Sequence, residues 1–484
     1  MGSFESGLPK AFTRLDVDSM RRHASLAPSA VPSAAAARIA FVRVALFPAT
    51  GPRFPATDTR RRSSPTVVAV GYVVAALAGV SIDLWWSGSG TTSRVWAEDG
   101  TIFLSTAYRT RYVAGLASPY AGYLQVLPRC VADFATALPV RDAAWVLAAS
   151  AAAVRVAVSL FVFHASSGHL RATSVRVMLA SSVVLLPVGG LEVLDNIANL
   201  HWFLTFAAFW AVLWRPARRS ECALAAVVVM LAVDSDPLTA LLLPMVVLRA
   251  ITLQRWRDQL VTMFFAAAGV LQTWAVLSGT RPPHETFGAS AVARLFGVRV
   301  LVGALAGYWH TVALWRHLHY AAIALGAIAV VALVSPALRV GGSRRWLAIW
   351  AGVGSALSFA ACFAEPAVVP HLKVDVVSSL TRYDVLPSLL MLTAIAAGLD
   401  ALHWPANLAV RGLVGAVFLS ALPVDLVGSA QLWAHLESTA PSWHNAIVNA
   451  RLDCQAADAP GDVWVLEEPA GWRVRLPCAA IDRR

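Results

Sequence analysis

The sequence predicts an all-α protein with many membrane-spanning helices. Of its 484 residues 58% are hydrophobic and only 14% are charged, whereas soluble domains carry about 25% charged residues. The mean hydropathy is +0.62, and several apolar runs reach the roughly 20 residues that a bilayer-spanning helix needs. A water-soluble protein has no core that could bury so many apolar side chains, so these runs are expected to face lipid.

The charge pattern indicates a lipid bilayer as partner and excludes nucleic acid. The formal net charge is +11, with 10 of the 39 Lys and Arg residues before residue 64. Many of the others lie in short loops between apolar runs, which is typical of cytoplasmic loops that face anionic lipid. Nucleic-acid binding requires a basic face with groove-reading or aromatic elements, and the sequence contains none. We therefore expect a multi-pass protein of the cell membrane.

Residues 1–64 form a basic segment that precedes the first apolar run. It lacks the compact apolar core and cleavage site of a signal peptide, and its Arg-, Ala-, Ser- and Pro-rich composition predicts a disordered cytoplasmic tail. Two alternatives stay open. The stretch AAAARIAFVRVALF at 34–47 also fits an amphipathic helix on the membrane surface, and a start codon assigned too far upstream would give the same composition.

The transmembrane domain is predicted at 65–427. Its first span, at 65–86, follows the basic run RRR at 60–62 and ends in a Trp pair, which places the N-terminus in the cytoplasm. Nine further spans are predicted at 143–165, 176–190, 197–214, 221–233, 237–250, 259–278, 346–364, 383–402 and 407–427.

The region 297–338 allows two paths. If 297–314 crosses the membrane, the later RVGGSRR lies outside, against the positive-inside rule. If that stretch is re-entrant or interfacial, 316–338 crosses inward and RVGGSRR is cytoplasmic. We favour the second path, which gives eleven spans, an inside N-terminus and an outside C-terminus. The cytoplasmic segments then hold 22 of the 39 basic residues but only 7 of the 28 acidic ones.

This topology places two larger segments outside. The first is a loop at 87–142, for which interfacial helices are expected. The second is a short cap at 428–484, where Cys454 and Cys478 are 24 residues apart. An extracytoplasmic location permits a disulfide between them, so we expect a small β-rich cap closed by this bond. The other three cysteines lie in or beside apolar runs and are interpreted as small hydrophobic residues.

Two adjacent acids in the external loop are the first candidate functional residues. Glu98 and Asp99 occur in WAEDGTIF, about 12 residues beyond the first span. Adjacent carboxylates near lipid raise each other's pKa, which suits a general base or a metal ligand. The alternative is a simple turn, because Gly100 follows the pair.

The motifs WAEDGTIFLSTAY, PYAGYLQVLPR, NIANLHWFL and RYDVLP resemble those of bacterial polytopic membrane proteins grouped with the C-type glycosyltransferases. The resemblance covers roughly residues 65–430. It implies transfer of a sugar from a polyprenyl-phosphate donor to a glycan, lipid or protein acceptor on the outer side of the membrane. By motif position the catalytic base is Asp99, with Glu98 as its neighbour or alternate, and the pair is the expected ligand of a divalent metal such as Mg or Mn.

The same resemblance directs attention to substrate-binding residues. An Arg can hold a phosphate in a bidentate manner, and Arg382 and Arg129 are the candidates, although either also fits an interfacial anchor. Tyr123 lies in the motif that contains Arg129. Asn199, His201 and Trp202 could line a sugar pocket, or could serve as polar groups at a helix start.

Three other charges have competing interpretations. Asp236 and Pro237 are a natural start of a helix, and Asp234 beside them fits helix-end solvation. Arg155, near the middle of a span, is expected either to pair with an acid or to extend toward the nearer surface. The rival functions are a transporter or flippase of lipid-linked saccharides and a non-catalytic membrane protein.

Overall fold

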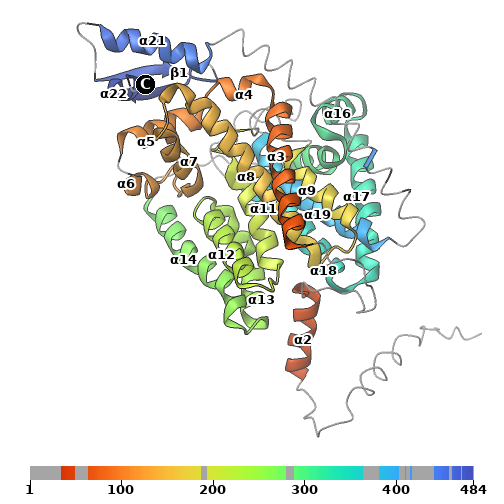
Figure 1. Ribbon diagram of the computed structural model, residues 1–484. Coiled ribbons are helices and arrows are strands. Elements are labelled where there is room, and N and C mark those ends of the chain that lie inside the picture. Colours follow the sequence, from red (N-terminus) through yellow and green to blue (C-terminus); the bar gives the residue numbers. More distant parts are fainter. Residues whose placement is uncertain are drawn as a thin grey trace, which may run out of the picture. The chain divides into compact units, whose positions relative to one another are not determined.

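Figure 1 shows the computed structural model, which describes residues 34–48, 64–110, 112–186, 193, 195–279, 288–363, 381–402, 409, 412, 415–416, 441–456, 461–469 and 471–482. The chain divides into two compact units, Met1–Val42 and Arg43–Arg484. Helix α2 (Ala34–Leu46) begins in the first unit and ends in the second. The segment expected to be a disordered tail is thus helical over Ala34–Leu46. Apart from 47, 48 and 64, its other residues lie outside the described part of the chain.

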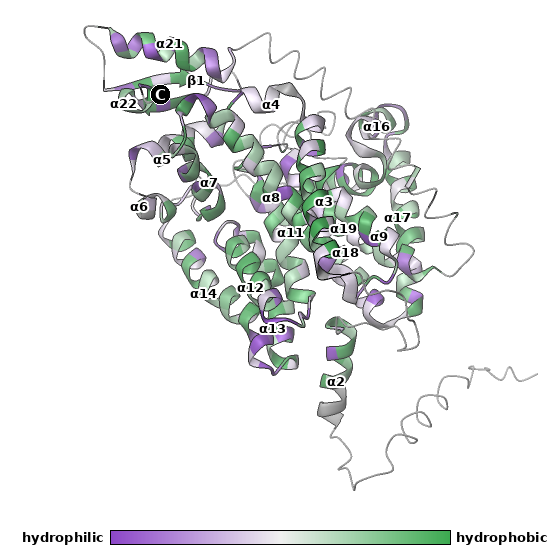
Figure 2. Ribbon diagram, in the orientation of Figure 1, coloured by the Kyte–Doolittle hydropathy of each residue, from purple (hydrophilic) through white to green (hydrophobic). Residues whose placement is uncertain are grey.

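Within the described residues, seven helical stretches are long and apolar enough to cross a membrane. They are Thr66–Ser87, Val140–Gly168, Trp256–Ser278, Ala289–Leu318, Tyr320–Val340, Gly342–Cys362 and Thr381–Ala401. The main helices in them are α3 (Pro65–Ser87), α8 (Ala143–Ala165), α14 (Trp256–Ser278), α17 (Tyr320–Val340), α18 (Gly342–Cys362) and α19 (Val385–Ala401). Figure 2 shows hydrophobic residues along their length. The protein is therefore an all-α membrane protein. The predicted span at 407–427 lies almost wholly outside the described residues.

The start of α3 illustrates why these helices begin where they do. The Ser64 hydroxyl accepts a hydrogen bond from the Val67 N–H at 3.2 Å, and Pro65 occupies the first helical position, where its missing N–H costs nothing. The helix ends at Ser87 because Gly88 adopts φ 86°, a conformation that is easy for glycine only.

Four shorter α-helices occur between the long helices α8 and α14 along the described part of the chain. They are α9 (Thr173–Val184), α11 (Leu200–Leu213), α12 (Arg219–Val233) and α13 (Leu243–Thr252), the last of which follows the 3₁₀ turn η5 (Pro237–Leu242). Every residue of α11 and of α19 is buried, as expected for helices that are apolar on all sides. These two helices form the centre of the main hydrophobic core.

Residues 289–318 form a helical hairpin. Helix α15 (Ala289–Phe296), the π-helical turn η6 (Gly297–Val302) and α16 (Gly303–Leu318) follow one another, and Gly307 breaks α16 with φ 74°. Val298 and Trp315 pack together on the two sides of this break, so the chain folds back on itself. Helix α17 then packs closely along η6. The approach is so close that a Cβ atom at Gly326 would lie 2.9 Å from Val302.

The loop at 87–142, which was predicted to be external, and the C-terminal region contain the remaining elements. The loop holds α4 (Ser89–Ser93), η2 (Asp99–Leu104), α5 (Ser105–Arg109), α6 (Tyr112–Leu116), α7 (Val126–Thr136) and η3 (Val140–Asp142). The C-terminal region holds α21 (Trp443–Gln455), β1 (Asp462–Leu466), β2 (Arg473–Pro477) and α22 (Cys478–Ile481). The strands pair antiparallel, with Val465 opposite Val474, and Figure 1 shows them grouped with α21 and α22. We call Trp443–Asp482 the cap.

Polar contacts distinguish the two ends of the helical bundle. The Trp443 indole donates to the Val140 carbonyl at 2.8 Å, which attaches the cap to the start of α8. We call this end of the bundle the cap end. At the opposite end, Asp400 pairs with Arg344 at 2.7 Å and accepts the N–H groups of Arg171 and Ala172. These bonds join α19, α18 and the start of α9. The turn η8 (Thr381–Asp384) precedes α19 at the cap end.

Candidate functional site

The acidic pair lies at a sharp bend of the loop at 87–142. Ala97 has φ 41°, which is uncommon for a residue with a side chain, and a π-helical turn begins at Asp99. As a result the two neighbouring carboxylates have different partners. Glu98 contacts residues of η8, and Asp99 contacts the segment before α11.

Asp99 connects two loops and is closed off from large ligands. Its Oδ2 accepts the N–H of Ile197 at 2.8 Å and its Oδ1 accepts the N–H of Ala198 at 2.9 Å. The side chain is 2% exposed, and the cavity beside it has a volume of about 10 Å³, room for no more than a water molecule. Burial raises the pKa of Asp99 to about 8. This carboxyl group is therefore built into the loop structure.

Glu98 faces a more open region and meets Arg382. The Arg382 guanidinium lies 3.3 Å from Glu98 Oε1, and the two side chains are 25% and 13% exposed. The Tyr120 hydroxyl forms a hydrogen bond with Glu98, and burial together with that negative charge raises the pKa of Tyr120 to about 12. Tyr120 is thus a protonated donor beside the carboxylate. The sequence did not single out Tyr120.

Aromatic and polar side chains from the start of α11 extend this region. Tyr383, which lies under the Arg382 guanidinium at 5.3 Å, packs edge-on against Trp202 at 5.5 Å. The Trp202 indole donates to Asn199 Oδ1 at 3.2 Å, and His201 packs on the Trp202 ring at 4.3 Å. We call Glu98, Tyr120, Trp202, Arg382 and Tyr383 the Glu98 site.

Asp236 and His201 form a second polar group beside the Glu98 site. Asp236 lies 3.2 Å from His201 Nδ1 and accepts the Thr205 hydroxyl at 2.8 Å. It also accepts the Leu238 N–H at 2.8 Å as the N-cap of η5, which is the helix-start role that its sequence position predicts. Asp234 is buried without a charged partner in the described residues, and burial raises its pKa to about 6.

Arg129 and Tyr123 lie in the same loop and contact aromatic and polar side chains of that loop. The Arg129 guanidinium packs over the Phe103 ring at 5.5 Å, and the other contact of that ring is Tyr120. Within the described residues, Nε and Nη1 of Arg129 are buried without a hydrogen-bond acceptor. The Tyr123 hydroxyl accepts a hydrogen bond from Gln125 at 3.1 Å.

The cap supplies acids that the sequence analysis missed. Glu468 forms a buried ion pair with Arg94 at 2.8 Å, and its backbone pairs with Trp96 in a short parallel bridge. Glu467, 5% exposed, forms a hydrogen bond with the Thr101 hydroxyl. Both acids thus lie against the segment that carries the acidic pair. The predicted outside position of EEP was the only signal in the sequence, since no spacing rule connects residues 374 positions apart.

The contact with Glu467 explains the glycine after the acidic pair. A Cβ atom at Gly100 would lie 1.8 Å from Glu467 Oε2 and 2.5 Å from Val474. Substituting Gly100→Ala is expected to displace the β1–β2 hairpin, at a cost of about 1–3 kcal/mol. Hydrogen exchange of residues 462–476 measures the loss of protection. Gly461→Ala is the control, because a Cβ there meets no atom within 4 Å; equal protection in both variants would contradict this prediction.

The stability of the cap is expected to fall as the pH rises. Burial raises the pKa of Glu467 to about 9, so this group is neutral in the folded protein and ionised in the unfolded chain between about pH 4.5 and 9. Its contribution to the stability of the cap is therefore complete below about pH 4.5 and is lost as the pH rises to about 9. Melting temperatures measured from pH 5 to 9 should decline less steeply in Glu467→Gln than in the unsubstituted protein; identical slopes would refute this.

Arg155 is paired rather than extended to the surface. It is fully buried, lies 3.0 Å from Asp83 and 3.8 Å from Asp195, and donates to the Val184 carbonyl at 2.7 Å. These contacts join α3, α8, the end of α9 and the loop that precedes α11. Arg155 is therefore a central structural residue of the bundle.

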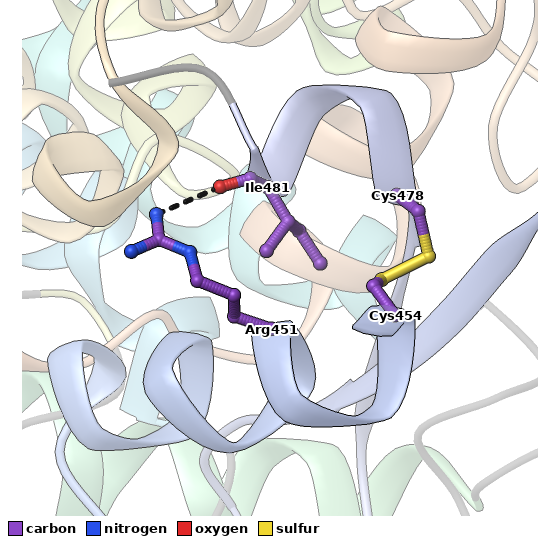
Figure 3. Close-up of a disulfide and its surroundings, with 4 residues drawn as sticks. All are labelled: Arg451, Cys454, Cys478 and Ile481. Atoms are coloured by element: carbon purple, nitrogen blue, oxygen red, sulfur yellow. Dashed lines mark hydrogen bonds between the residues drawn. A yellow bond between two sulfur atoms is a disulfide. The ribbon is translucent and has the colours of Figure 1, made fainter. Parts of the chain in front are cut away.

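The cap contains a disulfide between Cys454 and Cys478, shown in Figure 3. The bond connects the last turn of α21 to the start of α22, and Arg451 on α21 donates to the Ile481 carbonyl at 2.9 Å beside it. The cap is more helical than the β-rich fold expected, since two helices accompany its two strands.

The two carboxylates of the acidic pair differ in the oxygens that they can offer to a ligand. Among the described residues, no group of three or more His, Cys, Asp and Glu side chains is placed to hold a metal ion. Both oxygens of Asp99 already accept backbone N–H groups, which leaves Glu98 as the carboxylate of the pair that can offer an oxygen to a ligand.

No protein-family model matches the chain, and neither the curated proteins nor the solved structures give a match.

Proposed function

We propose that the protein is a membrane glycosyltransferase that uses a polyprenyl-phosphate sugar donor, as its resemblance to the C-type glycosyltransferases implies. The observation that carries the proposal is the meeting of Glu98 with Arg382. A carboxylate and a guanidinium from segments 284 positions apart lie together among aromatic rings, at the end of the bundle that the external loop covers. Inverting sugar transfer needs these two groups: a base for the acceptor hydroxyl and a cation for the leaving phosphate.

In the proposed reaction Arg382 binds the donor phosphate. A phosphate accepts two parallel hydrogen bonds from a guanidinium, so it competes with Glu98 for this side chain. Glu98 is thereby released from its ion pair. It takes the proton of the acceptor hydroxyl as the hydroxyl oxygen forms a bond to the anomeric carbon. The bond from that carbon to the phosphate oxygen breaks, and polyprenyl phosphate leaves with the electron pair, stabilised by Arg382.

The geometry supports Glu98 as the base and Asp99 as a positioning residue. The resemblance assigned the base to Asp99, but the two backbone hydrogen bonds and the small cavity leave no room for an acceptor beside that carboxylate. Trp202 and Tyr383 are only 3% and 6% exposed; Tyr383 packs between Trp202 and the Arg382 guanidinium and so supports the cation that would bind the phosphate. Mg²⁺ is commonly held by one or two carboxylates and substrate phosphates. A divalent ion would thus be held by Glu98 together with the donor.

The proposed topology has eleven spans, with the N-terminus inside and the cap outside. Contacts support the alternation: Asp99 binds Ile197 and Ala198 at one end, whereas Asp400 binds the start of α9 at the other. The fold-back of residues 289–318 at Gly307 supports the path in which this segment does not cross and α17 crosses inward. The Glu98 site would then lie on the extracytoplasmic side.

Purified protein in detergent tests the proposal directly. We expect release of polyprenyl phosphate from a polyprenyl-phosphate sugar when a mixed extract of envelope glycans and lipids supplies the acceptor. The same protein in vesicles distinguishes transfer from translocation of the intact donor. Translocation without release would favour a flippase, and neither activity would favour a non-catalytic membrane protein.

A further inference from the structure

Two apolar grooves lie along helix α8. The first has a volume of about 590 Å³, lies between α3, α8 and α9, and is lined by residues that include Gly71 and Phe163. The second has a volume of about 620 Å³ and lies between α8, α11 and α12, with Leu204 and Leu231 among its lining residues. Both volumes are within the range of small-molecule sites. Because α3 faces the membrane, with most of its apolar side chains exposed, lipid has access to the first groove.

The two grooves meet near the end of α8, and we call the place where they meet the mouth. Tyr72 and Leu160 line both of them, and the Tyr72 hydroxyl lies 3.3 Å from His164 Nδ1 in the last turn of α8. Glu221, at the start of α12, lines the second groove at this level. The shared mouth therefore lies at the end of the bundle opposite the cap.

The mouth carries excess positive charge. Arg176 packs over the Phe163 ring at 4.3 Å and donates from Nε and Nη2 to the Phe163 carbonyl. Its Nη1 has no hydrogen-bond partner in the part of the chain that the structure describes. Arg218 is exposed, and its charge acts on His164 together with that of Arg176.

Glu221, the acid at the mouth, already accepts hydrogen bonds from the backbone. Glu221 Oε2 accepts the N–H groups of Ala217 and Arg218 at 3.0 and 3.1 Å. Glu221 Oε1 lies 3.7 Å from His164 Nε2, so this one carboxylate faces the mouth against two arginines, and one positive charge remains in excess. An anionic group is therefore the complementary ligand for this mouth.

We propose that the paired grooves bind one anionic phospholipid from the leaflet opposite the cap. Its two acyl chains occupy the two grooves, and its phosphate lies at Arg176 and Arg218. Two chains on one headgroup match two grooves with one mouth, whereas a polyprenyl phosphate has one chain. The proposal does not depend on the reaction at the Glu98 site, because it concerns binding at the other end of the bundle.

Native mass spectrometry of the delipidated full-length protein tests the headgroup. We expect one bound phosphatidylglycerol, held more tightly than phosphatidylcholine. Removing one Arg contact near a membrane surface weakens binding about fivefold, so Arg176→Gln should raise the phosphatidylglycerol dissociation constant by that factor. Equal affinity for the two lipids, or an unchanged constant in Arg176→Gln, would overturn the proposal.

A second pair of variants tests the grooves. A Cβ at Gly71 meets no atom within 4 Å, so Gly71→Phe fills the first groove without displacing its walls and should abolish stoichiometric phosphatidylglycerol binding. Gly269→Phe on α14 is the matched control, since Gly269 also has open space around it, and it should bind normally. Unchanged binding in Gly71→Phe would refute the site. So would displacement of phosphatidylglycerol by an equal concentration of polyprenyl phosphate.

Discussion

Glu98→Gln is expected to lower the rate of sugar transfer by about 10²–10⁴-fold, the usual contribution of a general base. The amide keeps the size of the side chain and an oxygen for Tyr120 and Arg382, but it cannot take a proton from the acceptor. The fold should be unaffected, because Glu98 is the more exposed member of the acidic pair. Single-turnover release of polyprenyl phosphate by the purified variant measures the effect.

Two controls separate catalysis from structure. Asp142→Asn removes an exposed carboxylate at the start of α8 and should leave the rate unchanged. Asp99→Asn places an amide NH₂ against a backbone N–H, which leaves a buried donor unsatisfied at a cost of about 1–3 kcal/mol, so it should lower the melting temperature as well as the activity. If Asp99→Asn lost the activity with full stability while Glu98→Gln retained it, the base would be Asp99.

Arg155→Met is expected to destabilise the protein by about 3–5 kcal/mol, the range measured when one partner of a buried ion pair is removed. The substitution leaves Asp83 and Asp195 without their cation and the Val184 carbonyl without its donor. The yield of monodisperse protein and the midpoint of thermal unfolding in detergent measure the loss.

The exposed pair Arg141–Asp142, 3.9 Å apart, provides the comparison. Arg141→Met should cost less than about 1 kcal/mol, because surface ion pairs contribute little. Adding Asp83→Asn and Asp195→Asn to Arg155→Met should recover part of the stability, since the uncompensated charges are removed. A stable Arg155→Met variant would show that Arg155 does not hold the helices together.

The all-α membrane class and the positions of long apolar helices at six of the predicted spans follow from the sequence, because apolar length is a local property. Arg382 was selected for the same reason, as a cation at the outer end of a span. The different surroundings of Glu98 and Asp99 did not follow. They depend on the positive φ of Ala97 and on the π-helical turn, which no residue pattern predicts.

The acids of the cap could not be identified from the sequence for another reason. Glu467 and Glu468 contact the acidic loop only through tertiary packing, and the length of chain between them leaves no periodicity to detect. Gly100 was interpreted as a turn residue, whereas its lack of a side chain makes room for Glu467. The general lesson is that residue patterns do not reveal contacts between segments that lie far apart in the sequence.

The bridge between Trp96 and Glu468 also has a consequence for biosynthesis. The Ala97 N–H donates to the Glu468 carbonyl and the Glu468 N–H donates to the Val95 carbonyl, so the backbone next to the acidic pair is completed by residues that leave the ribosome long after it. A nascent chain arrested before residue 467 would carry every intervening helix and still lack the final support of its first loop. The first loop therefore reaches its final structure only after residues 467 and 468 have been synthesised.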